Sequence, residues 1–453
     1  MSDYIELLQL EVNKNPDRLL DVGNEEDPEE APPPCRALPP PCSIPRRLVV
    51  SPGLGGTPVT PQLTESLRRI LFGRTFHVFN YEWRKSSFVF RDPNSDLSYA
   101  LETDRGGAGP IQMVVQARVI KHLLFMHQNS LERRTLHSLS AVGQEQQERA
   151  LAAALSDCLW SAGQELSATV ALVAENYCIT PPLDYKLDNF TEKLQLFTFN
   201  RKEDVRKFVL DHIQCFKEEG GHGVILFLYS LICSRTVDRL KEDLDSSTHH
   251  LLHLSLGNFI CRQALLNLLL TGRACPHVFN GAVHVEERPP AERPLQGVLC
   301  RSDVGYLHWS REQMERDTLP QVGSMLKTPR FPIWVCCING SCSVLFSLNR
   351  MLLSDWKMEH LFYLYYYNGQ SSQRSTVRLT VGEDRDRPGW VGVQSYPLFA
   401  SSVLCADTHS HHWEASSTDT EGDPEKRFPS LEMTIRTKWA GAAITWNDTL
   451  PFY

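Results

Sequence analysis

The sequence predicts an α/β domain of the α+β type after a disordered arm, and three observations support this fold class. A mostly apolar run at 111–126 follows a Gly-rich turn, which is typical of a helix surrounded by protein. Two strand-like apolar runs meet at Asn339-Gly340, a strong β-hairpin signal. The composition before residue 63 is acidic and Pro-rich, which argues against a core there.

The arm comprises residues 1–62, and the domain comprises residues 63–453. Acidic residues fill most of 25–30, and proline triplets stand at 32–34 and 39–41. Such a segment buries too little apolar surface to offset the conformational entropy lost on ordering. Pro-rich tracts also dock into grooves of the SH3 type, so protein partners through the arm are the alternative to a plain linker.

Composition limits the classes of function. Of the 453 residues, 42% are hydrophobic, which supports a sizeable core. The net charge of −8 argues against nucleic acid as a partner, because phosphate binding needs clustered Lys and Arg. The best candidate for a membrane span, 223–233, is too short. The 13 cysteines form no C-x-x-C pair and no signal-peptide pattern precedes them, so we expect reduced thiols in the cytoplasm or nucleus.

In the first half of the domain, apolar residues at helical spacing predict a helix from Thr64 that ends at Gly73. Aromatic-rich runs at 76–83 and 88–90 favour short strands, whereas 130–175 favours helix. Further along, we expect a strand at 191–199, an amphipathic helix at 202–215, a buried element of either type at 223–231, and a helix at 265–272 capped by Gly272.

In the second half, the hairpin strands are expected at 333–337 and 342–348, and a further aromatic strand at 361–367. The polar segment 371–386 is expected to be a loop. The His-rich segment 405–427 is charged, and 431–438 alternates like a strand that closes the domain.

The Gly-rich turn at 106–109 is the place where chemistry is expected. The N-terminus of a helix favours negative charge, so a cysteine placed there would ionise more easily. The chain instead places Gly109 at the expected N-cap and Pro110 at the first helical position, with no Cys, Ser or Thr. The position therefore has the scaffold of a nucleophile site without a nucleophile.

The run from Gly106 to Phe125 resembles the catalytic segment of the MINDY deubiquitinases, in the branch of the third and fourth members. Those enzymes are cysteine proteases that trim polyubiquitin linked through the forty-eighth lysine of ubiquitin. Similar runs recur in order from the Phe-Asn and Glu-Trp block at 79–83 to the Thr-Lys-Trp run at 437–439. The resemblance implies a divergent papain-like cysteine-protease fold over about 64–453.

The same resemblance assigns the catalytic positions. The family motif reads Gly-Gly-Pro-Cys, so Gly109 stands at the nucleophilic cysteine. The family histidine corresponds to Ser341, and the glutamine that stabilises the oxyanion corresponds to Thr103. A cysteine protease needs a thiolate, a proton acceptor and oxyanion donors. The chain therefore resembles an inactive ubiquitin carboxyl-terminal hydrolase of this family, and we expect that it is not an enzyme.

Three functions remain open at this point. The first is a pseudo-deubiquitinase that holds polyubiquitin linked through the forty-eighth lysine without cleaving it. The second is a residual deubiquitinase that uses a non-standard cysteine, for which Cys336, Cys337 and Cys342 lie nearest to the lost histidine. A cysteine on an apolar strand is more often an inert small hydrophobe. The third is an interaction scaffold that does not bind ubiquitin.

No metal or cofactor is predicted. The run from Asp407 to His412 contains zinc-ligand types but lacks a second ligand pair at a recognised spacing, so a surface loop is favoured. His249 and His253 stand four residues apart and could share a helix face, where exposed or capping roles are favoured over metal binding.

Overall fold

The computed structural model describes most of the domain. The described residues form one compact unit, and the part of the arm before residue 44 lies outside them. The described ranges are 44–103, 106–126, 135–179, 185–284, 294–383, 429–447 and 449–451.

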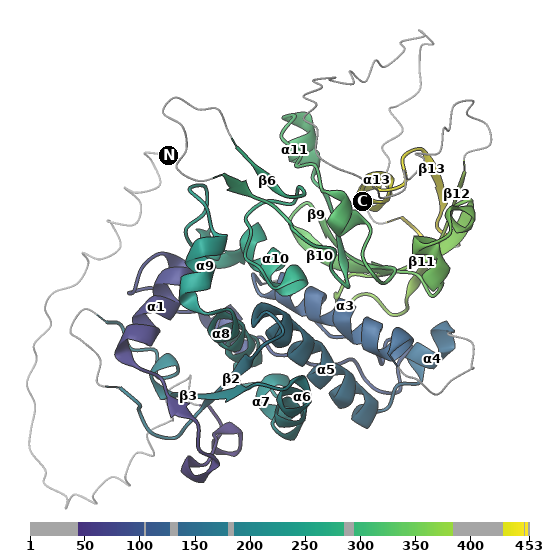
Figure 1. The fold of residues 1–453 in the computed structure, drawn as a ribbon. Coiled ribbons are helices and arrows are strands. Elements are labelled where there is room, and N and C mark those ends of the chain that lie inside the picture. The colour runs from purple at the N-terminus through teal and green to yellow at the C-terminus, as the bar shows by residue number, and fades with distance from the viewer. Residues whose placement is uncertain are drawn as a thin grey trace, which may run out of the picture. The chain divides into compact units, whose positions relative to one another are not determined.

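A six-stranded sheet forms one half of the domain (Figure 1). Its order, β13-β12-β11-β10-β9-β8, follows the chain in reverse, and only the β8–β9 pair is parallel. The Asn339-Gly340 turn joins β9 and β10, with φ values of 48° and 83° that suit a hairpin turn. The strands are β8 (Gly305–Trp309), β9 (Ile333–Ile338), β10 (Ser341–Phe346), β11 (Leu361–Tyr367), β12 (Val377–Glu383) and β13 (Ala442–Thr445).

The central helix α3 (Gly109–Phe125) packs on one face of this sheet, against β9 and β10 (Figure 1). Its opposite side contacts α5 (Gln144–Ala162) and α10 (Gln263–Thr271), so nearly every residue of α3 is buried. The predicted buried helix is confirmed. It begins one residue earlier than expected, because Ala108, and not Gly109, takes the N-cap position.

A second sheet of three strands has the order β1-β3-β2, with α8 (Gly223–Arg235) packed on β2. Its strands are β1 (Thr57–Pro58), β2 (Ala168–Val173) and β3 (Leu194–Phe199). Residues 44–62 were expected to belong to the disordered arm. In the structure Val50 bridges to Ala174 and Val59 is buried, so this segment packs on the domain.

The remaining elements connect these layers. A separate two-stranded hairpin consists of β4 (Leu252–Ser255) and β5 (Asn258–Cys261). The other helices are α1 (Pro61–Phe72), α2 (Tyr81–Lys85), α4 (Leu136–Ser140), α6 (Lys202–Asp211), α7 (Ile213–Lys217), α9 (Val237–Asp243), α11 (Arg311–Glu315), α12 (Ser324–Lys327) and α13 (Ser430–Arg436). Short strands β6 (Ala282–Val283) and β7 (Leu295–Gln296) pair, and five 3-10 turns cover Arg46–Leu48, Pro52–Leu54, Thr191–Lys193, Arg350–Leu353 and Trp356–Glu359.

Several sequence predictions of secondary structure are wrong. The run 76–83 ends in helix α2 because the Asn80 side chain caps it by accepting from the Trp83 amide. The expected helix 130–175 contains strand β2, all of whose residues are buried. The expected loop 371–386 contains β12, which pairs with β11 and β13. The expected strand 431–438 is helix α13.

Two apolar cores lie on the two faces of the six-stranded sheet. The α3 face carries Tyr306, Val335 and Val344 in the larger core. The other face packs under α13 in a smaller core built around Trp334 and Trp439, whose rings meet edge to face at 5.4 Å. Alternation along each strand therefore decides which core a side chain enters.

Within the described residues, no helix is both long enough and apolar enough to cross a bilayer.

Candidate functional site

The Gly-rich turn before α3 rests directly on the β4–β5 hairpin. A Cβ atom added to Gly107 would lie 1.7 Å from the carbonyl oxygen of Phe259, so only glycine fits there. The same carbonyl accepts a hydrogen bond of 2.9 Å from Trp83 Nε1. The turn and the hairpin are thus in backbone contact, and they form one continuous surface at the start of α3.

The first turn of α3 presents its N-terminus without a catalytic side chain. Ala108 makes no side-chain cap, and Gly109 and Pro110 are half-buried. The amides of Gly109, Ile111 and Gln112 already donate to the carbonyls of Gly106 and Ala108, and Pro110 contributes no N–H. Only the helix dipole therefore favours negative charge at this end, and Gly109 supplies no nucleophile.

Thr103 is fixed between α3 and the end of β11. Its amide donates to the carbonyl of Gly369 at 3.1 Å. A Cβ atom at Gly369 would lie 2.2 Å from Thr103 Oγ1 and 3.0 Å from Met113 Cε, so all three residues are in close contact. Two residues earlier, the Gln116 side chain accepts from the Leu101 amide at 2.5 Å, which holds this segment against α3.

Ser341 is the first residue of β10, the strand that pairs with β11 and packs on α3. Its side chain is exposed beside the hairpin turn. The three sequence-predicted positions are therefore carried by elements that touch one another at α3. Their assignment to the nucleophile, the histidine and the oxyanion glutamine stays a prediction.

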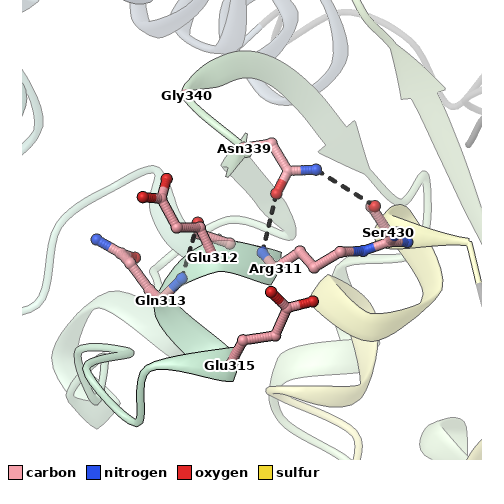
Figure 2. Close-up of a pocket in the computed structure, with 8 residues that line it drawn as sticks. Arg311, Glu312, Gln313, Glu315, Asn339, Gly340 and Ser430 are labelled. Atoms are coloured by element: carbon pink, nitrogen blue, oxygen red, sulfur yellow. Dashed lines mark hydrogen bonds between the residues drawn. The ribbon is translucent and has the colours of Figure 1, made fainter.

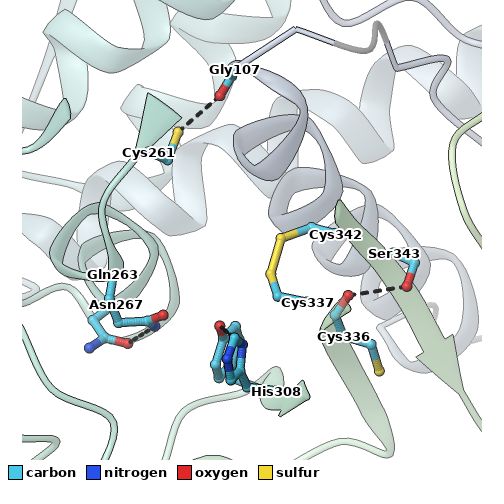
Figure 3. The surroundings of a disulfide bond; sticks show 10 residues. Gly107, Cys261, Gln263, Asn267, His308, Cys336, Cys337, Cys342 and Ser343 are labelled. Atoms are coloured by element: carbon cyan, nitrogen blue, oxygen red, sulfur yellow. Dashed lines mark hydrogen bonds between the residues drawn. A yellow bond between two sulfur atoms is a disulfide. The ribbon is translucent and has the colours of Figure 1, made fainter. Parts of the chain in front are cut away.

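A cysteine that sequence reasoning missed lies at the Gly-rich turn. The Sγ atom of Cys261, at the end of β5, lies 3.2 Å from the carbonyl oxygen of Gly107 (Figure 3). Burial raises the pKa of this thiol to about 12, so it is protonated at neutral pH. No local sequence pattern indicates this contact, because residues 107 and 261 meet only through the tertiary fold.

Of the three cysteines proposed from sequence, Cys336 faces the smaller core, where burial raises the pKa of its thiol. Cys337 and Cys342 form a disulfide across β9 and β10, with a Cα–Cα distance of 4.2 Å (Figure 3). The expectation of reduced thiols throughout is therefore wrong at these two positions. Cys337 and Cys342 stand opposite each other in the hairpin, and the Asn339-Gly340 turn determines this register.

An open pocket of about 890 Å³ lies at the tip of the β9–β10 hairpin (Figure 2). Asn339 closes one side, since its Oδ1 accepts from the Arg311 amide at 2.9 Å and its Nδ2 donates to Ser430 Oγ at 3.4 Å. The lining is polar and carries both signs of charge: Ser310, Arg311, Glu312, Gln313, Glu315, Asn339, Gly340 and Ser430.

The opposite half of α3 contains a buried charged network. Asp157 on α5 accepts from Lys121, from His122 Nε2 at 2.8 Å and from Lys202 at 2.7 Å, and Lys121 also contacts Asp303 at 3.0 Å. Burial alone would raise the pKa of Asp157, but the hydrogen bond from His122 and the neighbouring cations outweigh burial and hold this pKa well below its usual value. Burial lowers the pKa of His122, against the opposing effect of Asp157.

The structure describes only one of the two metal-ligand candidates, the pair His249 and His253. His253 lies on strand β4 while His249 precedes it, so the two do not share a helix face as expected. Among the described residues, no group of three or more His, Cys, Asp or Glu side chains is placed to hold a metal ion. The run from Asp407 to His412 lies outside those residues.

Comparison with known proteins identifies the family. Residues 68–448 match the family model described as "Deubiquitinating enzyme MINDY-3/4, conserved domain". The chain belongs to the MINDY-3/4 family of deubiquitinating enzymes. The family resemblance inferred from sequence is thereby confirmed, and the α+β fold class is also confirmed by the structure.

Named relatives agree with this family. The protein "Probable ubiquitin carboxyl-terminal hydrolase MINDY-4" of Mus musculus is 36% identical over 395 residues, which cover 87% of this chain and 47% of the relative. Its namesake in Xenopus tropicalis is 37% identical over 396 residues, with the same coverage. The "Ubiquitin carboxyl-terminal hydrolase MINDY-3 homolog" of Drosophila melanogaster is 28% identical over 238 residues, 52% of this chain and 40% of the relative.

This MINDY-3/4 domain spans about half the length of the MINDY-4 relatives it matches. No solved structure matches the chain significantly.

The prediction that the chain is not an enzyme is wrong by these comparisons. The family is described as deubiquitinating, and the relatives are named ubiquitin carboxyl-terminal hydrolases. The residues at Gly109, Ser341 and Thr103 exclude only one arrangement of catalytic side chains. Cys261 and His308 lie outside that arrangement, in the surroundings of the Cys337–Cys342 disulfide (Figure 3).

Proposed function

We propose that this chain binds polyubiquitin linked through the forty-eighth lysine of ubiquitin, on a surface formed by the Gly-rich turn and the β4–β5 hairpin. Family membership supports ubiquitin as the class of partner. The loss of side chains at Gly109 and Ser341 leaves the hairpin part of this surface in place, because neither residue belongs to the hairpin.

The observation that carries the proposal is the exposed apolar tip of the β4–β5 hairpin. Leu256 is completely exposed and has a left-handed φ of 48°, a conformation that is costly for a leucine. Leu254 and Ile260, on the two strands behind it, are 48% and 42% exposed. An apolar tip of this kind is stabilised when a partner covers it, as are the anchor residues of protein interfaces.

A polar contact holds the hairpin tip to the N-terminus of α2. Asn80 Nδ2 donates to Asn258 Oδ1 at 2.9 Å, which fixes the N-terminus of α2 to the hairpin turn. Tyr81, the first residue of α2, is 68% exposed beside this contact. A polar and aromatic rim thus continues the apolar tip toward Gly107, as in an interface with a central anchor and a wet edge.

The test is retention of long polyubiquitin by the purified chain. We expect chains linked through the forty-eighth lysine to be retained, and the Leu256→Asp variant to weaken binding by about 30-fold, as for an anchor worth about 2 kcal/mol. Leu166→Asp is the matched control, since Leu166 is an exposed leucine in a turn remote in sequence, between α5 and β2. Equal retention by both variants, or no retention by the unaltered chain, would contradict the proposal.

A gel run on the same samples measures cleavage of the polyubiquitin. One observation favours a second candidate function, a cysteine-type hydrolase that uses Cys261. This thiol lies beside the Gly-rich turn, where family chemistry takes place, although its pKa of about 12 disfavours the thiolate. A ubiquitin derivative with an electrophilic C-terminus should then form an adduct that Cys261→Ser abolishes. Cys233→Ser is the matched control, because burial also raises that pKa to about 12. An adduct at another thiol, or none, would reject this candidate.

A further inference from the structure

The disulfide at the β9–β10 hairpin belongs to a row of reactive side chains on the α3 face of the sheet. Ile338 and Ser341 flank the two-residue turn, so the next pair, Cys337 and Cys342, is a non-hydrogen-bonded pair with close Cα atoms. Paired residues of neighbouring strands point to the same face. Both sulfurs therefore lie on the side of the sheet that packs against α3 (Figure 3).

His308 continues this row on the other side of Cys337. The parallel register of β8 and β9 pairs His308 with Cys337. Within β8, Tyr306 enters the core on the α3 face and Leu307 enters the opposite core, so the alternation places His308 on the α3 face. Figure 3 shows this histidine among the surroundings of the disulfide.

Hydrogen bonds orient the imidazole of His308. Its Nε2 lies 2.6 Å from Gln313 Oε1, and because a carbonyl oxygen only accepts, Nε2 carries the proton. The other nitrogen, Nδ1, can then accept a hydrogen bond, and it lies 3.3 Å from the hydroxyl of Tyr306. Gln313 also lines the open pocket at the hairpin tip, which brings solvent to this group (Figure 2).

The Cys337–Cys342 disulfide contributes little to the stability of the fold. Cys337 and Cys342 are separated by only five positions, and the antiparallel ladder already holds their strands together. A ring this short removes little entropy from the unfolded chain. Cys342 is half-buried whereas Cys337 is 5% exposed, so an attacking thiol reaches the sulfur of Cys342 first. Accessible disulfides that contribute little to stability are typically the exchangeable ones.

We propose that Cys337–Cys342 is a thiol–disulfide exchange site at which a dithiol reductant releases Cys337 as a thiol paired with His308. One thiolate of the reductant attacks Cys342 Sγ, the Cys337–Cys342 bond breaks, and Cys337 leaves as a thiolate. The second thiol of the reductant then displaces Cys342, so the reductant is oxidised to a disulfide and the protein gains two thiols. His308 Nδ1 exchanges the proton of Cys337 with solvent and favours its thiolate.

The proposal is independent of ubiquitin binding, and its first test uses the full chain purified without reductant. Graded dithiothreitol is added, free thiols are alkylated with iodoacetamide, and the peptides are identified by mass spectrometry. We expect Cys337 and Cys342 to be unlabelled before reduction and to become labelled together in the folded protein. Labelling of both before reduction, or release only in denaturant, would overturn the proposal.

The second test measures the pH at which alkylation of Cys337 reaches half its maximal rate in the reduced protein. We expect a midpoint below the ordinary cysteine value of about 8.5, and His308→Asn should raise it and slow alkylation at pH 7 about tenfold. Gln313→Leu, which leaves the sheet unchanged, should shift the midpoint in the same direction by less. Cys336→Ser is the control, because Cys336 faces the other core, and should change nothing. If the midpoint were unshifted in both the His308 and the Gln313 variants, the proposed pairing of the Cys337 thiol with His308 would be wrong.

Discussion

The two ends of α3 differ in what their side chains contribute to the fold. Near the N-terminal end, the positions that the family resemblance assigns to catalytic residues are occupied by Gly109, Thr103 and Ser341. These residues are small, uncharged and at least partly exposed. In the second half, Lys121 and His122 are buried and charged or polar, and both bond to Asp157. Within the described residues, the side chains of the first set form no ion pair, whereas each member of the second set depends on the others.

This difference teaches that the chemistry of this domain is separable from its stability. Replacing an exposed side chain at the start of α3 costs little, because no buried partner loses its bond. Removing one member of the buried network leaves uncompensated charges in the core, which costs several kcal/mol. A chain of this family can therefore change its nucleophile position and retain the α3–sheet scaffold.

The largest expected effect comes from breaking the network. Asp157→Ala leaves Lys121 and Lys202 without this carboxylate, so the free energy of unfolding should fall by about 3–5 kcal/mol. Urea denaturation followed by circular dichroism measures the change. Glu145→Ala on the same helix is the control, because its pair with Arg149 is exposed, and it should change stability by less than about 0.5 kcal/mol. Equal losses would abolish the contrast between the two kinds of ion pair.

A smaller loss is expected from the Gly-rich turn. Gly107→Ala places a Cβ atom against the Phe259 carbonyl and should destabilise the domain by about 1–3 kcal/mol, since the backbone has to shift. In Gly106→Ala the new Cβ atom would lie 3.6 Å from the Glu82 Cβ, an ordinary contact, and we expect almost no change. Thermal unfolding of the two variants compares neighbouring glycines directly. A harmless Gly107→Ala would mean that the hairpin can move away from the turn.

Acid should weaken the second half of α3. The pKa of His122 is lowered in the fold, so unfolding gains protons and stability falls as pH drops below 6.5, by at most about 1.4 kcal/mol per pH unit. The pKa of Asp157 is also lowered, so its contribution is present above pH 3.8 and is lost as pH falls further toward its folded value. Urea midpoints from pH 7 to pH 3 measure this dependence, and His122→Gln should flatten the part between pH 6.5 and pH 4. A curve unchanged by His122→Gln would show that other groups, such as the buried His222, dominate.

The smallest effect on stability, with the largest effect on chemistry, is expected from restoring the family residues. Gly109→Cys, Ser341→His and Thr103→Gln together should change the free energy of unfolding by about 1 kcal/mol or less. The triple variant should also cleave polyubiquitin faster than the unaltered chain, as measured on gels. The double variant without Gly109→Cys is the control and should show no gain. No gain in the triple variant would place the fault in the assigned positions or in Pro110, which offers no N–H to the oxyanion.

The sequence predicted those elements that are specified locally. The buried helix α3, the Asn339-Gly340 hairpin and the Gly272 cap of α10 each depend on a few adjacent residues, and each is confirmed. Elements decided by distant partners were missed. Strand β12 contains the apolar positions Val377, Leu379 and Val381 in alternation, but polar residues flank it on both sides, and it is a strand because it pairs with β11 and β13.

The candidate site was predictable only where a motif is continuous in sequence. The Gly-rich turn was recognised because its glycines and Pro110 are adjacent to the helix they begin. The contact of Cys261 with Gly107 joins residues 154 positions apart, and the row from His308 to Cys342 depends on strand register. No local pattern specifies such pairs, so they required the fold.

The backbone contact between Gly107 and Phe259 also has a mechanical consequence. The β4–β5 hairpin is short, with its apolar tip at Leu256 and its other end in contact with the turn that begins α3. Because Gly107 has no space in which to yield, force applied at the tip is transmitted to the amides that open the helix. A ligand bound at Leu256 would therefore alter the rate of amide hydrogen exchange at 107–112. Exchange at the start of α3 would then report whether the hairpin has bound a ligand.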